Sequence, residues 1–155
     1  MGDYPFFPLF VDLSRKKIVV VGAGNIAKRR IETLVRFTEA FTVVAPEIHP
    51  VLLPLEREGK LHILRKPYAP ADLDGAGLVL AATNSAAVND AVWRDCRERL
   101  IPVNVSSDKS KSDFYFPGIA RRDNVVVGVT ASGKDHAEAK HVTEKLRFLL
   151  ETGEL

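Results

Sequence analysis

The stretch KKIVVVGAGNIAKRR, residues 16–30, decides the fold. Its apolar run, 18–21, is continuous rather than alternating, which is typical of a strand buried on both faces of a sheet. A glycine turn follows at once, and apolar residues then recur at helical spacing among lysines and arginines. We therefore predict a buried strand over 17–23 that leads through a tight turn into a helix over 25–39.

The same alternation of strand and helix continues along the chain. Further strands are predicted at 41–46, 62–68, 77–83 and 101–105, and helices at 49–61 and 84–100. Most of these strands are short, β-branched and continuously apolar. Buried strands that alternate with helices favour an α/β fold with a doubly wound parallel sheet.

The last part of the chain follows a different pattern. Residues 113–133 are predicted to form two strands joined by a polar turn at 121–124, as in an antiparallel hairpin, and a helix is predicted over 135–151. We therefore divide the chain into a sheet domain, 1–112, and a small α+β segment, 113–155. Two strands and a helix are too few for an independent core, so we expect this segment to pair with its copy in a two-fold homodimer.

Composition restricts the classes of partner. The net charge of +2, from 22 basic and 20 acidic residues, is too balanced to favour nucleic acid. No apolar run approaches the ~18 residues of a membrane helix. The first residues, MGDYPFFPLFVDL, have two prolines and no basic region, so we expect no signal peptide. The single cysteine, Cys96, fits a reducing, cytoplasmic setting and a buried structural thiol. His136 and His141 do not share a helix face, and no metal site is expected.

The glycine turn matches the G-x-G-x-x-G/A pattern that binds dinucleotides. Gly22 permits the tight turn, Gly24 lets the backbone approach a pyrophosphate, and Ala27 is small enough for the helix to pack on the strand. Asn25 and Ile26 begin the helix, where free N–H groups and the helix dipole favour phosphate. A glycine turn that merely connects a strand to a helix is the alternative. Within a complete βαβ unit, we favour dinucleotide binding.

Residues at the ends of three further predicted strands bear on the choice of cofactor. At the end of the second strand, where an acid would hold the ribose hydroxyls, Pro46 is followed by Glu47. No Lys or Arg follows that would hold a 2′-phosphate, so NAD is favoured over NADP. Thr83 and Asn104 end later strands at the carboxyl edge, where open α/β sheets bind ligands. The amide of Asn104 would equally serve to cap the following loop.

Segments along nearly the whole chain resemble one known family. They are YPFFPLFVDLSRKKIVVVGAGNIAKRRIETL, TVVAPEI, LVLAATNSAAVN, IPVNVSSDKSKSDFYFPG and VVVGVTASGKD. These segments are similar to the precorrin-2 dehydrogenase family, the N-terminal module of siroheme synthases. The resemblance implies a Rossmann-like NAD-binding domain over 1–112 and a dimerisation segment over 113–155. It also implies NAD-dependent oxidation of a tetrapyrrole, precorrin-2, to sirohydrochlorin in siroheme biosynthesis, and some members of the family also insert ferrous iron.

The sequence departs from this family at the expected catalytic position. The family's aspartate lies in an Asn-Val-x-Asp pattern, and here Ser107 stands at that position with Asp108 one residue later. Both are catalytic candidates, although Asp108 would equally cap the polar loop. The missing aspartate puts iron chelation in doubt. The alternative function is a dimeric NAD-sensing regulatory module without chemistry, against which the segment 104–117 argues.

Three basic residues, Lys28, Arg29 and Arg30, follow the glycine turn directly. They would either meet the carboxylates of a substrate or lie on the solvated outer face of the helix. We favour the solvated face, because a run of charges on a helix is usually exposed.

Overall fold

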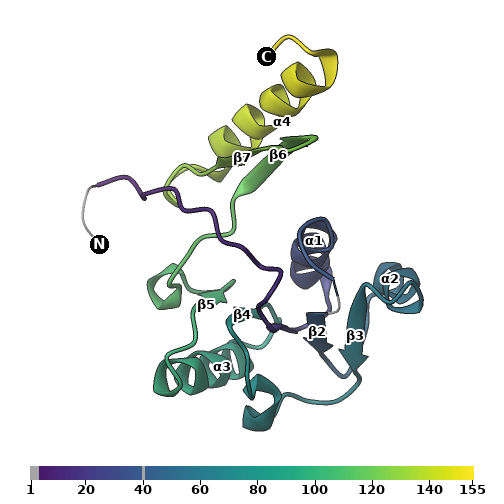
Figure 1. Ribbon diagram of the computed structural model, residues 1–155. Helices are drawn as coiled ribbons and strands as arrows, with labels where there is room; N and C mark the ends of the chain where they lie inside the picture. Colours follow the sequence, from purple (N-terminus) through teal and green to yellow (C-terminus); the bar gives the residue numbers. More distant parts are fainter. Residues whose placement is uncertain (1–3, 40) are drawn as a thin grey trace. The chain divides into compact units, whose positions relative to one another are not determined.

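The structure, a computed structural model, describes residues 4–39 and 41–155 (Figure 1). Residues 1–3, on which part of the signal-peptide expectation rests, lie outside the described residues. In the described part of the chain, no helix has the length and apolar character needed to cross a membrane.

The chain divides into two compact units, and each is described by itself. The larger unit comprises Asp12–Phe114, and the smaller combines Tyr115–Leu155 with the opening segment up to Val11. The sequence prediction assigns the opening segment to the sheet domain, 1–112. The structure instead groups its described residues with the C-terminal segment, for reasons of packing given below.

The larger unit is built on a parallel sheet of five strands in the order β3-β2-β1-β4-β5. The strands are β1 (Ile18–Val21), β2 (Phe41–Val44), β3 (Leu61–Leu64), β4 (Leu78–Ala81) and β5 (Val103–Val105). The last residue of β1, Val21, aligns with Val44 of β2 and Ala81 of β4, so the strands end together at one edge. This arrangement confirms the doubly wound, Rossmann-like fold.

Helices connect these strands. They are α1 (Asn25–Leu34), α2 (Leu53–Arg57) and α3 (Ala86–Glu98), with short 3₁₀ turns η1 (Pro50–Leu52), η2 (Pro70–Leu73) and η3 (Lys109–Lys111). The first helix ends earlier than the predicted residue 39, where Val35, Phe37 and Thr38 have low helix propensity. The predicted helix 49–61 is divided into η1 and α2, and neither η2 nor η3 was predicted.

The core explains why the strands are continuously apolar. On one face of the sheet, Val92 and Cys96 of α3 pack with buried valines of the strands. Ala27 and Ile31 of α1 are also fully buried, and Figure 1 shows α1 and α3 on opposite sides of the sheet. Because helices cover both faces, successive residues of a strand such as β1 are all buried.

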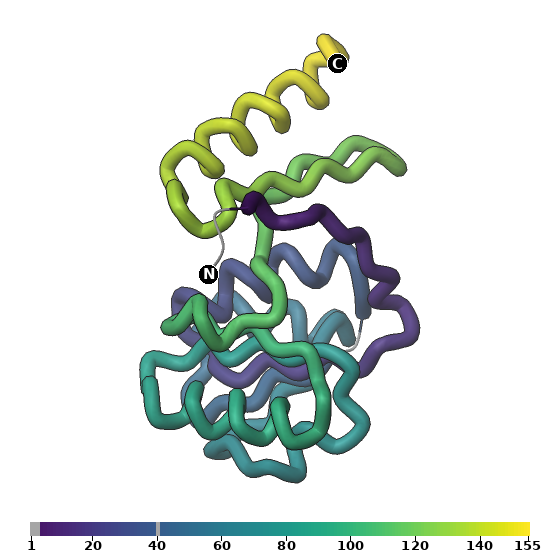
Figure 2. Tube along the Cα trace, turned by 90° about the vertical axis from the view of Figure 1, so that its left-hand side faces the viewer, coloured from purple at the N-terminus to yellow at the C-terminus, as the bar shows by residue number. Residues whose placement is uncertain are grey.

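The smaller unit contains the predicted hairpin and helix. Strands β6 (Gly118–Arg122) and β7 (Val125–Val129) pair in antiparallel fashion, and α4 spans His136–Thr152. Figure 2 shows the hairpin and α4 running side by side. Two hydrogen bonds join them: Arg147 Nε donates to the carbonyl oxygen of Ile119 at 2.8 Å, and an Arg122 guanidinium nitrogen donates to that of Leu150 at 2.7 Å.

The opening segment joins this unit through Phe6. The Phe6 ring packs on Tyr115 with ring centroids 4.5 Å apart, and the Phe6 N–H donates to Ser132 Oγ at 3.1 Å. These contacts are why the opening segment groups with the C-terminal residues.

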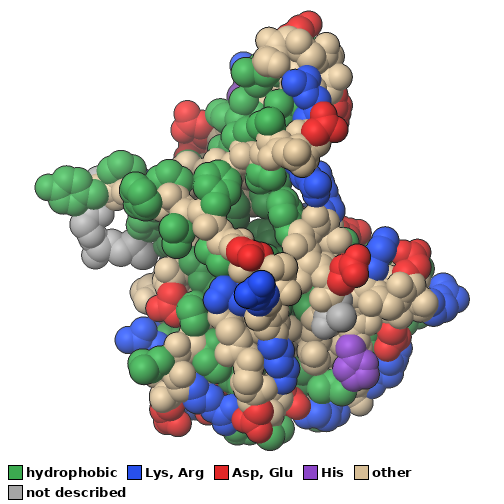
Figure 3. Space-filling model, in the orientation of Figure 1, with side chains coloured by type: hydrophobic (Ala, Val, Ile, Leu, Met, Phe, Trp, Pro, Cys, Tyr) green, Lys and Arg blue, Asp and Glu red, His purple; other side chains and the backbone are tan. Residues whose placement is uncertain are grey.

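The core of the smaller unit is small. Among its described residues, the buried ones are Ala120, Thr143 and Leu150. Several large apolar side chains are instead exposed, and Figure 3 shows hydrophobic side chains gathered on this unit.

Candidate functional site

The glycine turn after β1 is held in place by the neighbouring strand ends. The Gly22 N–H donates to the carbonyl oxygen of Val44 at 2.9 Å, and the carbonyl oxygen of Ala23 accepts from the His49 N–H at 3.0 Å. Gly22 has a φ of +113°, and an added Cβ would collide with the backbone of Ala82. Glycine is therefore required at position 22 by the fold itself.

Gly24 differs, because the fold gives no reason for a glycine there. Its φ is −86°, and an added Cβ would meet only Asn84 Nδ2, at 3.9 Å. Gly24 is the N-cap of α1, yet no side chain caps the helix and no acidic residue lies in its first turn. The exposed residues Asn25 and Ile26 follow directly. The helix N-terminus is thus open to an anion, and the missing Cβ leaves room for a group that approaches the backbone.

The end of β2 lies next to this turn. Pro46 and Glu47 follow the strand and are exposed. The basic residues that follow the neighbouring strand β3 are both paired: Arg65 binds Glu56 at 2.5 Å, and Lys66 binds Asp72 at 2.6 Å. The two basic side chains directly after β3 are thus each paired with an acid, while the carboxylate of Glu47 after β2 is exposed.

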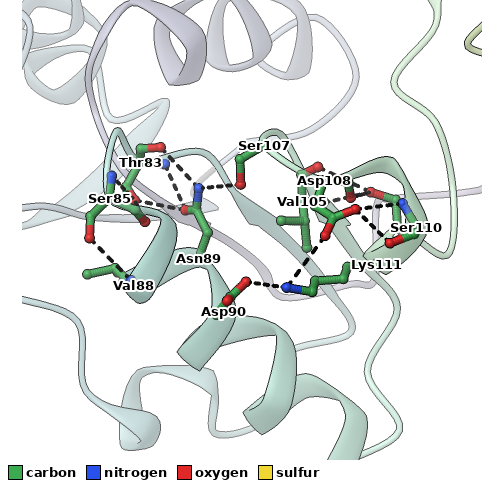
Figure 4. A network of polar contacts seen from close by, with 11 residues as sticks. Thr83, Ser85, Val88, Asn89, Asp90, Val105, Ser107, Asp108, Ser110 and Lys111 are labelled. Carbon is green, nitrogen blue, oxygen red and sulfur yellow. Dashed lines mark hydrogen bonds and ion pairs between the residues drawn. The ribbon is translucent and has the colours of Figure 1, made fainter.

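The turn between β4 and α3 is organised by a buried amide, that of Asn89 (Figure 4). The Thr83 N–H and hydroxyl donate to Asn89 Oδ1 at 3.1 and 2.8 Å. Asn89 Nδ2 donates to the carbonyl oxygen of Thr83 at 3.1 Å and to Ser107 Oγ at 3.1 Å. One side chain of α3 thus joins the predicted residues Thr83 and Ser107.

Asp108 points away from this junction and caps η3. Its carboxylate accepts hydrogen bonds from the Ser110 N–H at 2.9 Å and the Ser110 hydroxyl at 2.7 Å. Lys111 lies 3.5 Å from the same carboxylate and binds Asp90 at 2.6 Å. The bonds from Ser110, and then Lys111, hold the pKa of Asp108 below its usual range. Asp108 is therefore engaged in the loop, whereas Ser107 is exposed.

Asn104, predicted to end the fifth strand, is instead the buried middle residue of β5, and both ends of its amide contact the protein. Its Oδ1 accepts a hydrogen bond from Arg30 of α1, and its Nδ2 donates to the carbonyl oxygen of Phe114 at 2.8 Å. Burial lowers the pKa of the Arg30 guanidinium. The predicted solvated face is therefore wrong for Arg30, although Arg29 is exposed. The side chain of Arg30 reaches back to β5 because α1 covers that face of the sheet.

Asn89 is a site residue that was not predicted, although the sequence carries a signal for it. In the predicted helix 84–100, Val88, Val92 and Cys96 recur at helical spacing, and Asn89 is a polar residue among them. A buried polar side chain needs hydrogen-bond partners. Asn89 is 0% exposed, and its partners are Thr83 and Ser107, which follow β4 and β5. The contact of Arg30 with Asn104 had no such signal, because it joins residues far apart in sequence.

No metal centre is assembled in the part of the chain that the structure describes. There, no group of three or more His, Cys, Asp or Glu side chains is placed to hold an ion. The arrangement instead offers the open N-terminus of α1, free space beside Gly24, and the hydroxyl groups of Thr83 and Ser107 at the carboxyl edge of the sheet.

Comparisons with known proteins agree with this geometry. The chain is 39% identical over 145 residues to siroheme synthase 1 of Cronobacter sakazakii, covering 94% of this chain and 31% of that protein. It is 38% identical to the siroheme synthase of Methylobacillus flagellatus, covering 92% of this chain and 31% of that protein. The chain thus spans about a third of the length of these curated relatives. The resemblance to siroheme synthases is confirmed.

A solved structure is also similar. The chain matches SirC, a precorrin-2 dehydrogenase, with a TM-score of 0.80 and 27% identity, covering 96% of this chain and 76% of that one. A family described as putative NAD(P)-binding matches residues 9–118, which include the glycine turn and the ends of all five parallel strands. The chain therefore belongs to the putative NAD(P)-binding family.

Proposed function

We propose that this protein is an NAD-dependent precorrin-2 dehydrogenase that acts in siroheme biosynthesis. The observation that carries the proposal is the similarity to siroheme synthases over 94% of the chain. The likeness to SirC supports the same reaction, since that protein is a precorrin-2 dehydrogenase. The oxidation removes a hydride and a proton from precorrin-2, so that precorrin-2 and NAD⁺ give sirohydrochlorin, NADH and H⁺.

The residues at the glycine turn suit a dinucleotide. The open N-terminus of α1 would receive the pyrophosphate, with Gly24, Asn25 and Ile26 supplying backbone N–H groups. The space beside Gly24, where a Cβ would meet nothing closer than 3.9 Å, is what a closely bound phosphate requires. When bound, NAD would supply the hydride acceptor, and this chain orients it.

The surroundings of the second strand favour NAD over NADP. Glu47 is exposed after Pro46, where it would accept hydrogen bonds from the ribose hydroxyls. A 2′-phosphate there would be repelled by that carboxylate. Because Arg65 and Lys66 are each paired with an acid, neither compensates for this repulsion. We expect titration with both nucleotides to give tighter binding of NAD.

At the catalytic position we favour Ser107 over Asp108. The carboxylate of Asp108 is used by Ser110 and Lys111, and its lowered pKa makes it a weak proton acceptor. Ser107 is exposed and is oriented by Asn89 at the carboxyl edge of the sheet. Without an available carboxylate at that position, we expect oxidation without insertion of iron. The amide of Asn104 is buried and bonded to Arg30 and to the carbonyl oxygen of Phe114, so we propose that Asn104 supports the carboxyl edge of the sheet and does not contact the cofactor directly.

The protein is further proposed to act in the cytoplasm as a homodimer. The smaller unit buries few side chains, which supports pairing with a second copy. A single cysteine, which is buried and free, agrees with a reducing compartment.

An anaerobic assay tests the proposed function. The protein is incubated with precorrin-2 and NAD, and the absorbance of sirohydrochlorin and of NADH is followed together. Formation of both in equal amounts supports the proposal, whereas binding of NAD without turnover would favour a regulatory module. A parallel incubation of sirohydrochlorin with ferrous iron, compared with the same mixture without protein, tests the expected absence of iron insertion.

A further inference from the structure

We propose that Asn89 is a positioning residue, which holds Thr83 and Ser107 together as one unit at the carboxyl edge of the sheet. This inference rests on the proposed function for its effect on turnover. Its effect on the protein's own backbone is independent of the reaction. Neither the glycine turn nor the polar loop after β5 includes Asn89, which lies on α3.

The first support is that the Asn89 amide is fully used. It is 0% exposed, its two N–H groups donate to Thr83 and Ser107, and its oxygen accepts twice from Thr83. A carboxamide offers two donors and one acceptor oxygen with two lone pairs, so no capacity is left over. A buried amide with this set of bonds has one orientation, and it fixes the groups that it binds.

The second support is the position of the two groups that it binds. The backbone of Ala82 and Thr83 lies against Gly22, so closely that a Cβ on Gly22 would come within 3.0 Å of the Thr83 nitrogen. Thr83 therefore supports the glycine turn directly. Ser107 follows β5, the neighbour of β4 in the sheet. Asn89 consequently links the turn that would hold the nucleotide to the loop with the candidate catalytic position.

The third support concerns the direction of the bond to Ser107. Because Asn89 Nδ2 is the donor, Ser107 Oγ acts as the acceptor and keeps its own proton. The exposed hydroxyl is then available as a donor to a group bound at the edge of the sheet. Asn89 thus determines both where the Ser107 hydroxyl lies and how it is used.

Asn89→Leu is the test variant, since it has similar volume and removes all four hydrogen bonds. Cys96→Ala is the matched control, because Cys96 lies on the same face of α3, is also 0% exposed and belongs to the apolar core of the sheet. Both variants are expected to lower the melting temperature. Only Asn89→Leu is expected to weaken NAD binding and to lower kcat, each by roughly tenfold, the effect of one lost hydrogen bond of ordinary strength.

The coupling to Ser107 separates positioning from general destabilisation. In a Ser107→Ala background the loss of kcat caused by Asn89→Leu should largely disappear, because the hydroxyl that it positions is gone. In a Ser107→Thr background, which restores a hydroxyl, the loss should return. Additive effects of Asn89→Leu and Ser107→Ala on kcat would overturn the proposal.

Hydrogen exchange makes the test independent of the reaction. Asn89→Leu should speed exchange of the Thr83 amide, which donates to Asn89, and of the Asp108 amide in the Ser107 loop, relative to Cys96→Ala. If the wild-type protein does not oxidise precorrin-2, the proposed function fails, but faster exchange at both sites still supports the link. Unchanged exchange in the Asn89→Leu protein would refute the link, whatever the wild-type activity.

Discussion

At the scale of single residues, the two glycines of the turn have different physical reasons to be there. Gly22 has a positive φ and lies against the backbone of Ala82, so the fold excludes any other residue. Gly24 has ordinary backbone geometry and open space around it. A glycine that the fold does not require is best explained by a ligand that needs the space.

Gly24→Asp tests this distinction. We expect the variant to fold, because the new Cβ meets only Asn84 Nδ2 at 3.9 Å. NAD binding should weaken at least about 100-fold, since two like charges about 4 Å apart repel by ~4 kcal/mol at an effective dielectric of 20. Circular dichroism and titration of NAD measure the two properties. Gly22→Ala is the contrasting control, in which the fold itself should be destabilised; unchanged NAD affinity of Gly24→Asp would place the site elsewhere.

Asp108→Asn tests the choice between the two catalytic candidates. The carboxylate caps η3, and its lowered pKa keeps it ionised near neutral pH. A lowered pKa adds stability above the ordinary pKa of aspartate, and that stability is lost as the pH falls through the lowered value. We expect the rate of sirohydrochlorin formation near pH 7 to change by less than about threefold. A fall of ~10²–10⁴-fold, typical of a lost general base, would instead identify Asp108 as that base.

Residues that act locally could be predicted from the sequence, whereas those that act across the fold could not. The glycine turn, Pro46 and Glu47 follow from their position after a strand. The contact between Arg30 and Asn104 joins α1 to β5 across the sheet, and no local pattern indicates it. Capping of the polar loop by Asp108 was predicted beside a catalytic role, but η3 was not, because a short polar loop gives no periodic signal.

At the scale of the elements, α3 serves two purposes along one face. Its first turn places Asn89 between two strand ends, and further along Val92 and Cys96 pack into the core of the sheet. The sequence predicted this helix because its apolar residues recur at regular helical spacing. The C-terminal end of α1 and the division of the predicted helix 49–61 were less predictable, since prolines and β-branched residues act within single turns.

The thiol of Cys96 provides a test of that packing. Burial, the largest cause, raises the pKa of Cys96 to about 12. The thiol should therefore stay protonated and unreactive toward a disulfide reagent at pH 8, and react fully in denaturant. Because the pKa is raised, the unfolded state ionises first, and this group's contribution to stability falls as the pH rises from about 9 toward 12. Rapid labelling of the native protein at pH 8 would contradict the buried position.

At the scale of the whole molecule, the two units differ in how well they bury their side chains. The larger unit has a sheet covered on both faces by helices. In the smaller unit, β7 reads VVVGV, yet none of its residues is buried. An accessible apolar strand of this kind is typical of a surface that packs against another chain.

We predict that this partner is a second copy of the chain, paired through the smaller unit in a two-fold dimer. Light scattering at micromolar concentration should give twice the mass of one chain. Val125→Glu, at a β7 side chain that is 52% exposed, should cost the single chain little but convert the dimer to monomers, because a charge would be buried in the interface. Val51→Glu is the matched control, since Val51 is 45% exposed in the larger unit and should leave the dimer intact. A wild-type monomer would refute the prediction, and a Val125→Glu protein that stays dimeric would move the interface away from the start of β7.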